Sequence, residues 1–298
     1  MSALAGSPLV RFDRHGTTAH LTIDNPPVNV LTSAVLHSIS EGLSRADEDP
    51  EVRAVVLDGA APRAFAAGAN IRDMVSMGPK DAARYGANGQ GVTVQIERLP
   101  LPVIAAVHGS CLGGGCEIAQ ACDFILASED AVFGQPEVNL GIMPGWGGTR
   151  RLPRRIGAAR AREWILMGRS VPALEARAAG LVWKVVPRES LLAEAYLIAE
   201  ELARRPALAL AAAKYAINRS LDPLEMEGLA FELSMWSDLF GTDGQREGMR
   251  AFLEKRAPKV SGRGRWSEES RAFPFGERRK PAKQGAPTTP RPRAKGKN

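Results

Sequence analysis

Two glutamates, Glu117 and Glu137, lie in apolar, glycine-rich stretches of the sequence. Glu117 falls in the first turn of a helical pattern that follows three glycines at 113–115, and Glu137 follows Pro136. A glycine turn at a helix start leaves backbone N–H groups without intrahelical partners, and the helix dipole strengthens their attraction for a negative oxygen. Two carboxylates beside such a turn predict an active site with acid–base chemistry.

A second stretch, 63–74, contains residues that could approach a ligand. Small side chains at 66–69 allow close contact with the backbone, and Asn70 is placed to cap a helix that starts after it. A tight strand-to-helix loop with no ligand explains the same residues, and this stretch alone does not decide between the two. The glycine-rich loop at 141–149 lacks the GK[ST] ending of a phosphate-binding loop.

The elements that must position these residues follow from the spacing of apolar side chains. A strand at 103–107, a helix at 116–121 and a strand at 124–127 surround Glu117. A short strand is expected to end at Phe65. The other predicted strands are 9–14, 17–23, 52–57 and 182–186, and the other predicted helices are 31–46, 81–99, 149–155, 158–167, 172–180, 190–204, 206–219, 223–240 and 243–256.

The composition is that of an ordinary globular protein, with 44% hydrophobic and 24% charged residues. No apolar run approaches the roughly 18 residues that cross a bilayer, and the N-terminus lacks the features of a secretory signal. We therefore expect a cytoplasmic protein with no membrane partner. Cys111, Cys116 and Cys122 are odd in number and lack metal-ligand spacing, so we expect no disulfide framework and no metal site.

The net charge of +6 belongs to the end of the chain. Residues 262–298 hold eleven Lys and Arg against three Asp and Glu, so residues 1–261 carry a net charge of −2. This segment also holds five Pro and five Gly and few aliphatic residues, which predicts a basic disordered tail. The tail could bind RNA or another acidic partner, although an unstructured extension without a partner is the simpler interpretation.

Four blocks of sequence, in order, resemble signatures of the enoyl-CoA hydratase/isomerase (crotonase) family. They are AFAAGANIRDM (64–74), PVIAAVHGSCLGGGCEIAQACDFILAS (102–128), FGQPEVNLGIMPGWGGTRRLPRRIG (133–157) and REGMRAFLEKR (246–256). Four ordered blocks are more specific than a lone glycine motif, and the resemblance covers residues 10–258.

The resemblance implies an α/β fold, a ClpP/crotonase-like spiral of repeated β-β-α units with a C-terminal helical assembly region. Residues 1–188 would form the spiral core with the active site, 189–261 the helical oligomerisation region, and 262–298 the tail. The family assembles homotrimers, often paired as hexamers. It acts on acyl-CoA thioesters, which implies that coenzyme A enters as part of the substrate and that no other cofactor is needed.

The resemblance also implies roles for individual residues. The backbone N–H groups of Ala69 and Gly114 would form an oxyanion hole for the thioester oxygen. Glu137 would supply the proton at Cα, and Glu117 would orient and activate the water. The other expected contacts with coenzyme A or the acyl group are Ala67, Asn70, Ile71, Arg72, Trp146, Trp236 and Lys255.

Five of these contacts have specific expectations. Arg72 could meet a phosphate of coenzyme A, and Trp236 and Lys255 match positions at its nucleotide end. Trp146 stands where smaller residues are common, so it either shapes the acyl pocket or packs beneath the loop. Asn70 replaces the Asp that is usual in hydratases, which leaves the backbone donors in place.

The resulting hypothesis is an enoyl-CoA hydratase that adds water to a trans-2-enoyl-CoA. A Δ3,Δ2-enoyl-CoA isomerase is the nearest alternative, and it can manage with one carboxylate, so the pair Glu117 and Glu137 favours hydration. Another crotonase-type acyl-CoA enzyme is also possible. A scaffold that has lost catalysis is disfavoured by the same glutamate pair.

Overall fold

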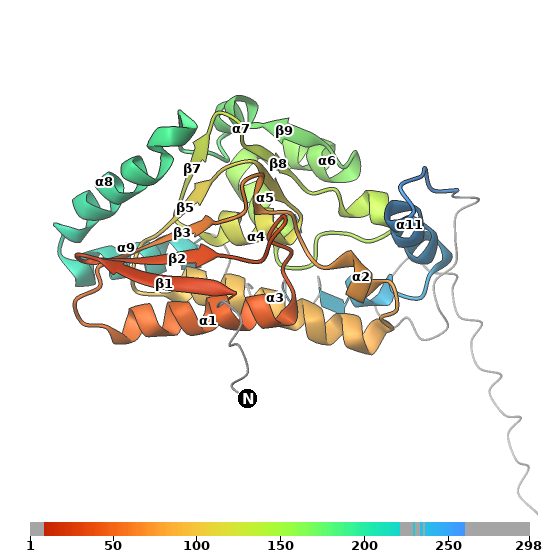
Figure 1. Ribbon diagram of the computed structural model, residues 1–298, viewed down its shortest axis with the longest axis horizontal. Helices are drawn as coiled ribbons and strands as arrows, with labels where there is room; N and C mark the ends of the chain where they lie inside the picture. Colours follow the sequence, from red (N-terminus) through yellow and green to blue (C-terminus); the bar gives the residue numbers. More distant parts are fainter. Residues whose placement is uncertain (1–8, 221–228, 230–232, 235, 260–298) are drawn as a thin grey trace, which may run out of the picture.

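The computed structural model describes residues 9–220, 229, 233–234 and 236–259. Its larger sheet has six strands in the order β1-β2-β3-β5-β7-β10 (Figure 1). β1 is antiparallel to β2, and all the other neighbours are parallel. The strands are β1 (Val10–His15), β2 (Thr18–Ile23), β3 (Ala54–Gly59), β5 (Val103–Val107), β7 (Phe124–Ser128) and β10 (Lys184–Val186).

A second sheet has four short strands in the order β4-β6-β8-β9. They are β4 (Ala64–Ala66), β6 (Ser110–Leu112), β8 (Val132–Gly134) and β9 (Ser170–Pro172). The chain passes from the large sheet to the small one three times, from β3 to β4, from β5 to β6 and from β7 to β8. This repetition is the expected spiral of β-β-α units.

Three elements of the site begin where neighbouring strands of the small sheet end. α2 (Ile71–Met74) comes after β4, α4 (Gly114–Ala121) after β6, and the short 3-10 helix η1 (Glu137–Leu140) after β8. Because β4, β6 and β8 are parallel, their carboxyl ends lie at one edge of the sheet. The loops that carry the candidate residues are therefore brought together by strand pairing.

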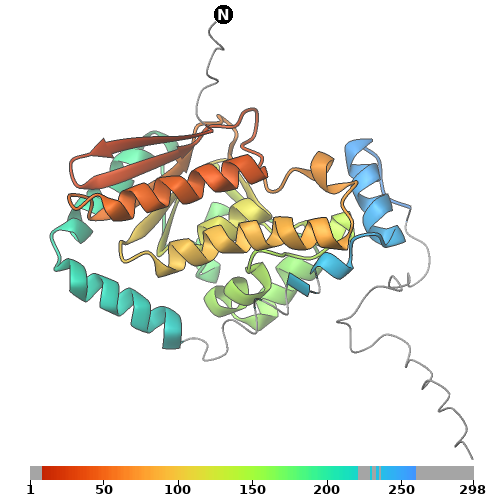
Figure 2. The ribbon, with the colours of Figure 1, turned by 90° about the horizontal axis from the view of Figure 1, so that it is seen from below.

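Helices cover both faces of the large sheet, as parallel sheets require. α8 (Leu191–Ala203) packs Leu191, Ala195 and Ala199 on one face. α1 (Ser33–Glu48) and α3 (Pro79–Arg98) run side by side below the sheets (Figure 2). The remaining helices are α5 (Gly148–Ile156), α6 (Ala158–Leu166), α7 (Ala173–Ala179), η2 (Arg188–Ser190), α9 (Ala207–Ser220) and α11 (Asp243–Leu253).

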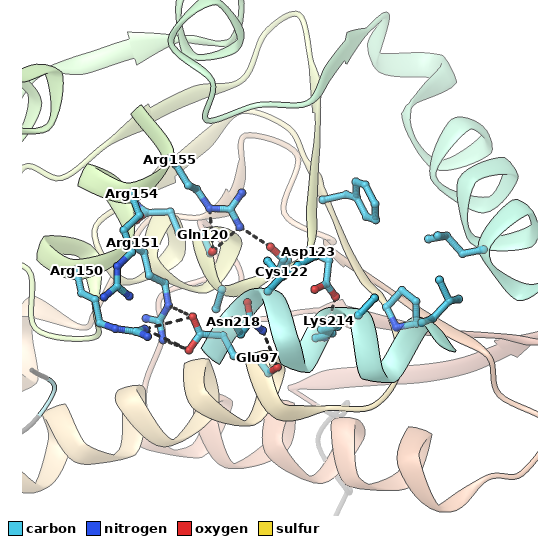
Figure 3. Close-up of a pocket in the computed structure, with 17 residues that line it drawn as sticks. Glu97, Gln120, Cys122, Asp123, Arg150, Arg151, Arg154, Arg155, Lys214 and Asn218 are labelled. Carbon is cyan, nitrogen blue, oxygen red and sulfur yellow. Dashed lines mark hydrogen bonds and ion pairs between the residues drawn. The ribbon is translucent and has the colours of Figure 1, made fainter. Parts of the chain in front are cut away.

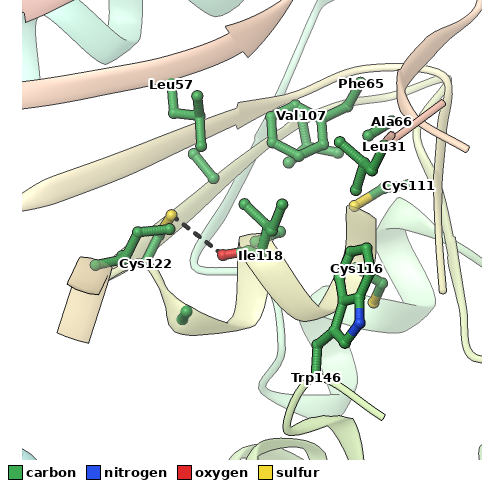
Figure 4. Close-up of a cluster of buried hydrophobic side chains, with 14 of the residues drawn as sticks. Leu31, Leu57, Phe65, Ala66, Val107, Cys111, Cys116, Ile118, Cys122 and Trp146 are labelled. Atoms are coloured by element: carbon green, nitrogen blue, oxygen red, sulfur yellow. Dashed lines mark hydrogen bonds between the residues drawn. The ribbon is translucent and has the colours of Figure 1, made fainter. Parts of the chain in front are cut away.

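The main core lies between the large sheet and helix α4 (Figure 4). Every residue of α4 is buried, including Glu117. Ile118 faces Leu57 and Val107 of the sheet, and Cys111 and Cys116 fill the space toward the small sheet. A buried, mostly apolar helix holds its first turn rigidly, which fixes the direction of the N–H groups at its start.

The expected elements agree with the structure to within a few residues, except for one helix. Five short elements were not predicted, the strands β6, β8 and β9 and the 3-10 helices η1 and η2. The helix predicted at 223–240 lies mostly outside the described residues, of which 233–234 and 236–238 are helical. The basic tail at 262–298 also lies outside them, and the division of the chain at residue 188 stays a prediction. None of the described helices is long and apolar enough to cross a membrane.

Candidate active site

A cavity of about 300 Å³ opens where the loops after β4, β6 and β8 meet. Its walls are mostly apolar, and its two carboxylates are Glu117 and Glu137, which are 2% and 8% exposed. Of the residues expected from the sequence, the cavity brings together Ala67, Ala69, Ile71, Gly114, Glu117, Glu137, Trp146 and Trp236.

Gly114 is the first residue of α4, so its N–H has no acceptor within the helix. Gly113 precedes it with φ at +51°, in the region that favours glycine. A Cβ on Gly113 would lie 3.1 Å from Oε1 of Glu137, so a side chain here would enter the site. The turn therefore brings backbone close to the carboxylate.

The loop that carries Ala69 runs against this turn. A Cβ on Gly68 would lie 3.1 Å from the carbonyl oxygen of Leu112 and 3.9 Å from Cα of Gly113. Among the described residues, no backbone carbonyl accepts a hydrogen bond from the N–H of Ala69 or of Gly114. The two segments can thus offer one donor each to a common oxygen.

Tyr85 of α3 holds the Ala69 loop in place, a role that the sequence did not reveal. Leu31 donates its N–H to the carbonyl of Gly68 at 2.9 Å, and the Tyr85 hydroxyl donates to the carbonyl of Leu31. The N–H of Asn70 approaches the same hydroxyl at 3.4 Å. Burial raises the pKa of Tyr85 above its usual value, so the hydroxyl remains a neutral donor at any ordinary pH.

Glu117 is held by the backbone of the loop before α5. Its Oε1 accepts N–H groups of Trp146 at 2.7 Å and of Gly148 at 2.8 Å. A Cβ on Gly148 would stand 3.0 Å from the same oxygen, so glycine is needed for this approach. An ionised oxygen accepts such bonds more strongly than a neutral one, which favours Glu117 as a carboxylate.

Glu137 is held by Gln135, which the sequence did not single out. With the amide oriented to satisfy its neighbours, Gln135 donates to both oxygens of Glu137, at 2.9 and 3.2 Å, and accepts from Gln120 at 2.9 Å. Gln135 is 1% exposed, so this arrangement is shielded from water. The two-residue spacing of Gln135 and Glu137 does not predict this contact, because the contact depends on the turn of the chain at Pro136.

The apolar walls come from segments far apart in the sequence. Trp146 and Trp236 are both buried, and Phe252 of α11 lies at the rim, half exposed. The resemblance predicts that Trp236 contacts the nucleotide end of coenzyme A, and that contact stays a prediction. The ring of Trp236 lies in the same cavity wall as Glu117 and packs against Gly145.

Asn70, Arg72 and Lys255 do not line the cavity. Asn70 caps α2 as expected, since its side-chain oxygen accepts the N–H of Arg72 at 3.2 Å, and its amide donates to Asp73 at 2.8 Å. Arg72 is exposed on α2, and Lys255 is exposed just after α11. These two helices are neighbours (Figure 1), so both cations lie outside the apolar cavity on adjacent elements.

A second cavity, of about 460 Å³, lies between α3, α5 and α9 and is bordered by charged side chains (Figure 3). Arg151 donates to the two oxygens of Glu97 at 2.7 and 2.8 Å, and Lys214 donates to Asp123 at 2.7 Å. Arg155 donates to carbonyls at the end of α4. These contacts connect neighbouring segments and have a structural role. We therefore assign the chemistry to the first cavity.

Metal chemistry has no evident ligand set in the part of the chain that the structure describes. No group of three or more His, Cys, Asp and Glu side chains is placed there to hold an ion. The cavity itself offers two carboxylates, backbone donors and apolar walls. This arrangement suits a substrate with an apolar chain and a carbonyl oxygen that gains negative charge.

Comparison with known proteins agrees with this geometry. The sequence model of the enoyl-CoA hydratase/isomerase family matches residues 13–263. The short-chain-enoyl-CoA hydratase of Clostridium acetobutylicum is 41% identical over 254 residues, which cover 85% of this chain and 97% of that protein. The crotonyl-CoA hydratase of Syntrophomonas wolfei is 41% identical over 246 residues, or 82% of this chain and 95% of that protein.

Solved structures show the same likeness in three dimensions. The enoyl-CoA hydratase of Mycobacterium avium subsp. paratuberculosis aligns with a TM-score of 0.76 at 32% identity, over 85% of this chain and 99% of that one. The two-sheet spiral is therefore the crotonase fold. The chain belongs to the enoyl-CoA hydratase/isomerase family.

Proposed function

We propose that this protein is an enoyl-CoA hydratase, which adds water to a trans-2-enoyl-CoA to give the 3-hydroxyacyl-CoA. The observation that carries the proposal is the presence of Glu117 and Glu137 in one apolar cavity beside two backbone donors. Relatives that are named as hydratases and are 41% identical over most of the chain support it.

The N–H groups of Ala69 and Gly114 would bind the thioester oxygen. This oxygen gains negative charge when hydroxide adds to Cβ, because the electrons of the double bond move toward the carbonyl. Fixed donors stabilise that charge without reorganisation, and one such donor is worth about 3–4 kcal/mol of transition-state energy. Gly114 is the first residue of α4, so the helix dipole strengthens the attraction of its N–H for the negative oxygen.

The two glutamates would divide the proton transfers. Glu117, held as a carboxylate by two backbone N–H groups, accepts a proton from the water that attacks Cβ. Glu137 donates a proton to Cα, which completes the addition of one water molecule. Gln135 keeps the Glu137 carboxyl in a fixed orientation for this transfer.

Coenzyme A would extend from the cavity past α2. Ala67 and Ile71 line the exit, and their small or apolar side chains suit the pantetheine arm. Arg72 and Lys255 stand on adjacent elements outside the cavity, where cations can meet the phosphates of the nucleotide. Asn70 would contribute by capping α2 and so holding the loop of Ala69.

Isomerisation is the alternative reaction for this family. Moving a double bond from Cβ–Cγ to Cα–Cβ needs only one group to carry a proton, and Glu137 alone could do so. The two N–H groups that hold Glu117 would then have no chemical purpose. Both carboxylates lie in the cavity, so hydration is the better match to the geometry.

The test is to mix the purified full-length protein with crotonyl-CoA and follow the absorbance of the conjugated thioester. Hydration lowers the absorbance and gives a product heavier by one water molecule. A 3-enoyl-CoA substrate supplies the comparison, because isomerisation raises the absorbance. A protein that acts only on the 3-enoyl thioester would disprove the hydratase proposal.

We also propose that the reaction needs no cofactor beyond the coenzyme A of the substrate. Backbone amides and carboxylates can supply both the charge stabilisation and the proton transfers. Dialysis against a strong chelator should therefore leave the rate of hydration unchanged. A rate that falls on dialysis and returns with an added metal ion would contradict this expectation.

The expected assembly is a homotrimer or a hexamer made of two trimers. Several large apolar side chains are exposed on the single chain, which is typical of surfaces that are covered by a partner. They are Leu166, Met167, Leu174, Trp183, Leu197, Leu208, Tyr215 and Ile217. Sedimentation equilibrium measures the mass directly, and a monomer at micromolar concentration would exclude both assemblies.

We further propose a cytoplasmic location. Cys111, Cys116 and Cys122 are free and buried, and free thiols persist best in a reducing compartment. Burial raises the pKa of Cys122 to about 12, which keeps it protonated and unreactive. Cell fractionation tests the location, and recovery of the protein from a membrane or secreted fraction would contradict it.

A further inference from the structure

The indole of Trp146 is seated between two helices with almost no space around it. A Cβ on Gly89 of α3 would lie 2.2 Å from ring atoms Cδ2 and Cε2, and a Cβ on Gly114 would lie 2.2 Å from Cζ3. Tyr85 meets the ring edge-on, with centroids 5.6 Å apart. Glycine is therefore required at both positions, because a Cβ at either one would overlap the indole.

The backbone of Trp146 is fixed as firmly as its ring. Its N–H donates to Glu117, and its carbonyl accepts from the Thr93 hydroxyl at 3.1 Å and from Arg151 at 2.7 Å. Arg151 is itself held by Glu97. Because both the ring and the main chain are constrained, the indole cannot swing aside to admit a larger ligand.

The glycines of α3 support this interpretation. Gly86 and Gly89 lie one turn apart inside a helix, where glycine is less favourable than alanine. Gly86 receives the ring of Trp236, since a Cβ there would lie 2.9 Å from Cζ3. Gly91, two residues beyond Gly89, has open space around it. The space left by the absent side chains of Gly86 and Gly89 is thus filled by the two indoles that line the cavity. Trp236 lies against Gly86, and Trp146 lies against Gly89.

We propose that Trp146, packed against Gly89, closes the cavity on its α3 side and restricts the enzyme to short enoyl groups. The inference rests on the proposed hydratase function and adds the substrate class to it. The cavity of about 300 Å³ is at the lower end of ligand sites, and the indole forms part of its wall, so an acyl chain that extends toward α3 would have to displace the ring. Gly89 sets how far the ring withdraws from the cavity.

The experiment measures kcat/KM for crotonyl-CoA, trans-2-hexenoyl-CoA and trans-2-decenoyl-CoA. It compares the native protein with Trp146→Ala, Trp146→Phe and Gly89→Ala, and with Gly91→Ala as the control on the same helix. The readout is the ratio of kcat/KM for the longer substrates to that for crotonyl-CoA. This ratio cancels any general loss of activity that follows from disturbing Glu117 or Gly114.

The native ratio should be low, and Trp146→Ala should raise it by about tenfold or more, since each methylene that fits a hydrophobic pocket is worth at least that much. Trp146→Phe should raise it less. Gly89→Ala should lower it, because the new Cβ pushes the ring off its seat. Combining Gly89→Ala with Trp146→Phe should restore part of the loss, and Gly91→Ala should leave the ratio unchanged.

Two outcomes overturn the inference: a native enzyme that hydrates decenoyl-CoA as efficiently as crotonyl-CoA, or a ratio that Trp146→Phe and Gly89→Ala both leave unchanged. If the Trp146→Ala variant shows no cooperative unfolding transition, it is not natively folded. The ratios of Trp146→Phe and Gly89→Ala then test the inference. A native protein that hydrates none of the three thioesters would instead contradict the proposed function, so the two failures are distinguishable.

Discussion

The backbone N–H of Trp146 donates to Oε1 of Glu117 at 2.7 Å, so the residue that bounds the cavity also holds a carboxylate inside it. Any change that moves the main chain at Trp146 will move Glu117 as well. Substrate size and acid–base geometry are thereby linked in one loop.

Glu117→Gln should lower kcat for crotonyl-CoA hydration by roughly 100-fold or more, because the amide cannot accept a proton from water. The amide oxygen can still accept the N–H groups of Trp146 and Gly148, so the melting temperature should change little. Steady-state kinetics and thermal unfolding test both statements. Glu41→Gln, on the exposed face of α1, is the control, and a Glu117 variant as active as that control would refute the assignment.

Glu137→Gln should also lower hydration by roughly 100-fold or more, and it should have a second effect that Glu117→Gln lacks. In deuterium oxide, the native enzyme should exchange the Cα hydrogen of the hydroxyacyl product. Mass spectrometry should find this exchange lost in the Glu137 variant and partly retained in the Glu117 variant.

Gln135→Met should give an intermediate loss, because it removes the amide that orients Glu137 without removing the carboxyl. Glu137 becomes a carboxylate as it gives its proton to Cα, and a charge-assisted hydrogen bond to it is then worth about 1.5–3 kcal/mol, which corresponds to roughly tenfold or more in rate. The loss should fall on kcat and leave KM nearly unchanged. A variant with native exchange at Cα would show that Gln135 does not position Glu137.

Tyr85→Phe should reduce the free energy of unfolding by about 1–3 kcal/mol, because the carbonyl of Leu31 loses its buried donor. It should also lower kcat, since the loop of Ala69 is no longer fixed. Denaturant unfolding and crotonyl-CoA kinetics measure the two effects. Thr17→Val, in the exposed turn between β1 and β2, also removes a hydroxyl and should produce neither effect, and equal losses in the two variants would argue against the role of Tyr85.

Glu97→Gln should reduce the free energy of unfolding by about 1.5–3 kcal/mol near neutral pH, because the buried guanidinium of Arg151 loses its charge-assisted hydrogen bonds to this carboxylate. Burial alone would raise the pKa of Glu97, but its bonds to Arg151 and the charge of Arg150 outweigh burial, so the pKa is lowered. This carboxylate therefore stabilises the fold fully above its unfolded pKa, and the stabilisation is lost as pH falls through the lowered value.

The variant should accordingly lose less stability than the native protein when the pH falls from neutral to acid. Urea unfolding at a series of pH values gives the comparison. Glu163→Gln removes an exposed ion pair with Arg169 and should leave the curve nearly unchanged. Parallel acid profiles for native protein and Glu97→Gln would mean that the pair is not ionised in the fold.

Much of the fold could be predicted because its signals are local. The strand at 103–107 and the helix after Gly113 have clear apolar patterns, and Asn70 has the chemistry of a cap. β6, β8 and β9 have three residues each, which is too short for an alternating pattern. Their positions depend on pairing with strands distant in the sequence, and that information is not local.

The site was predicted in part for the same reason. Glu117 and Glu137 stand out because carboxylates are unusual in apolar, glycine-rich stretches. Tyr85 and Gln135 have no such contrast with their surroundings, and their roles arise from contacts made only after folding. The ring of Trp236 lies against Gly86, and this match of shape is also not expressed by the residue types.

The parallel pairing of β4 with β6 has a consequence for the spacing of the two proposed oxyanion donors. Strands in a sheet are about 4.8 Å apart, and two amides at that separation can each reach a shared atom at about 2.9 Å. The ladder between Ala64 and Ser110 therefore brings the loops of Ala69 and Gly114 to a suitable separation, while Tyr85 and the cap of Asn70 hold the Ala69 loop. A change in the pairing of β4 with β6 would move both donors at once.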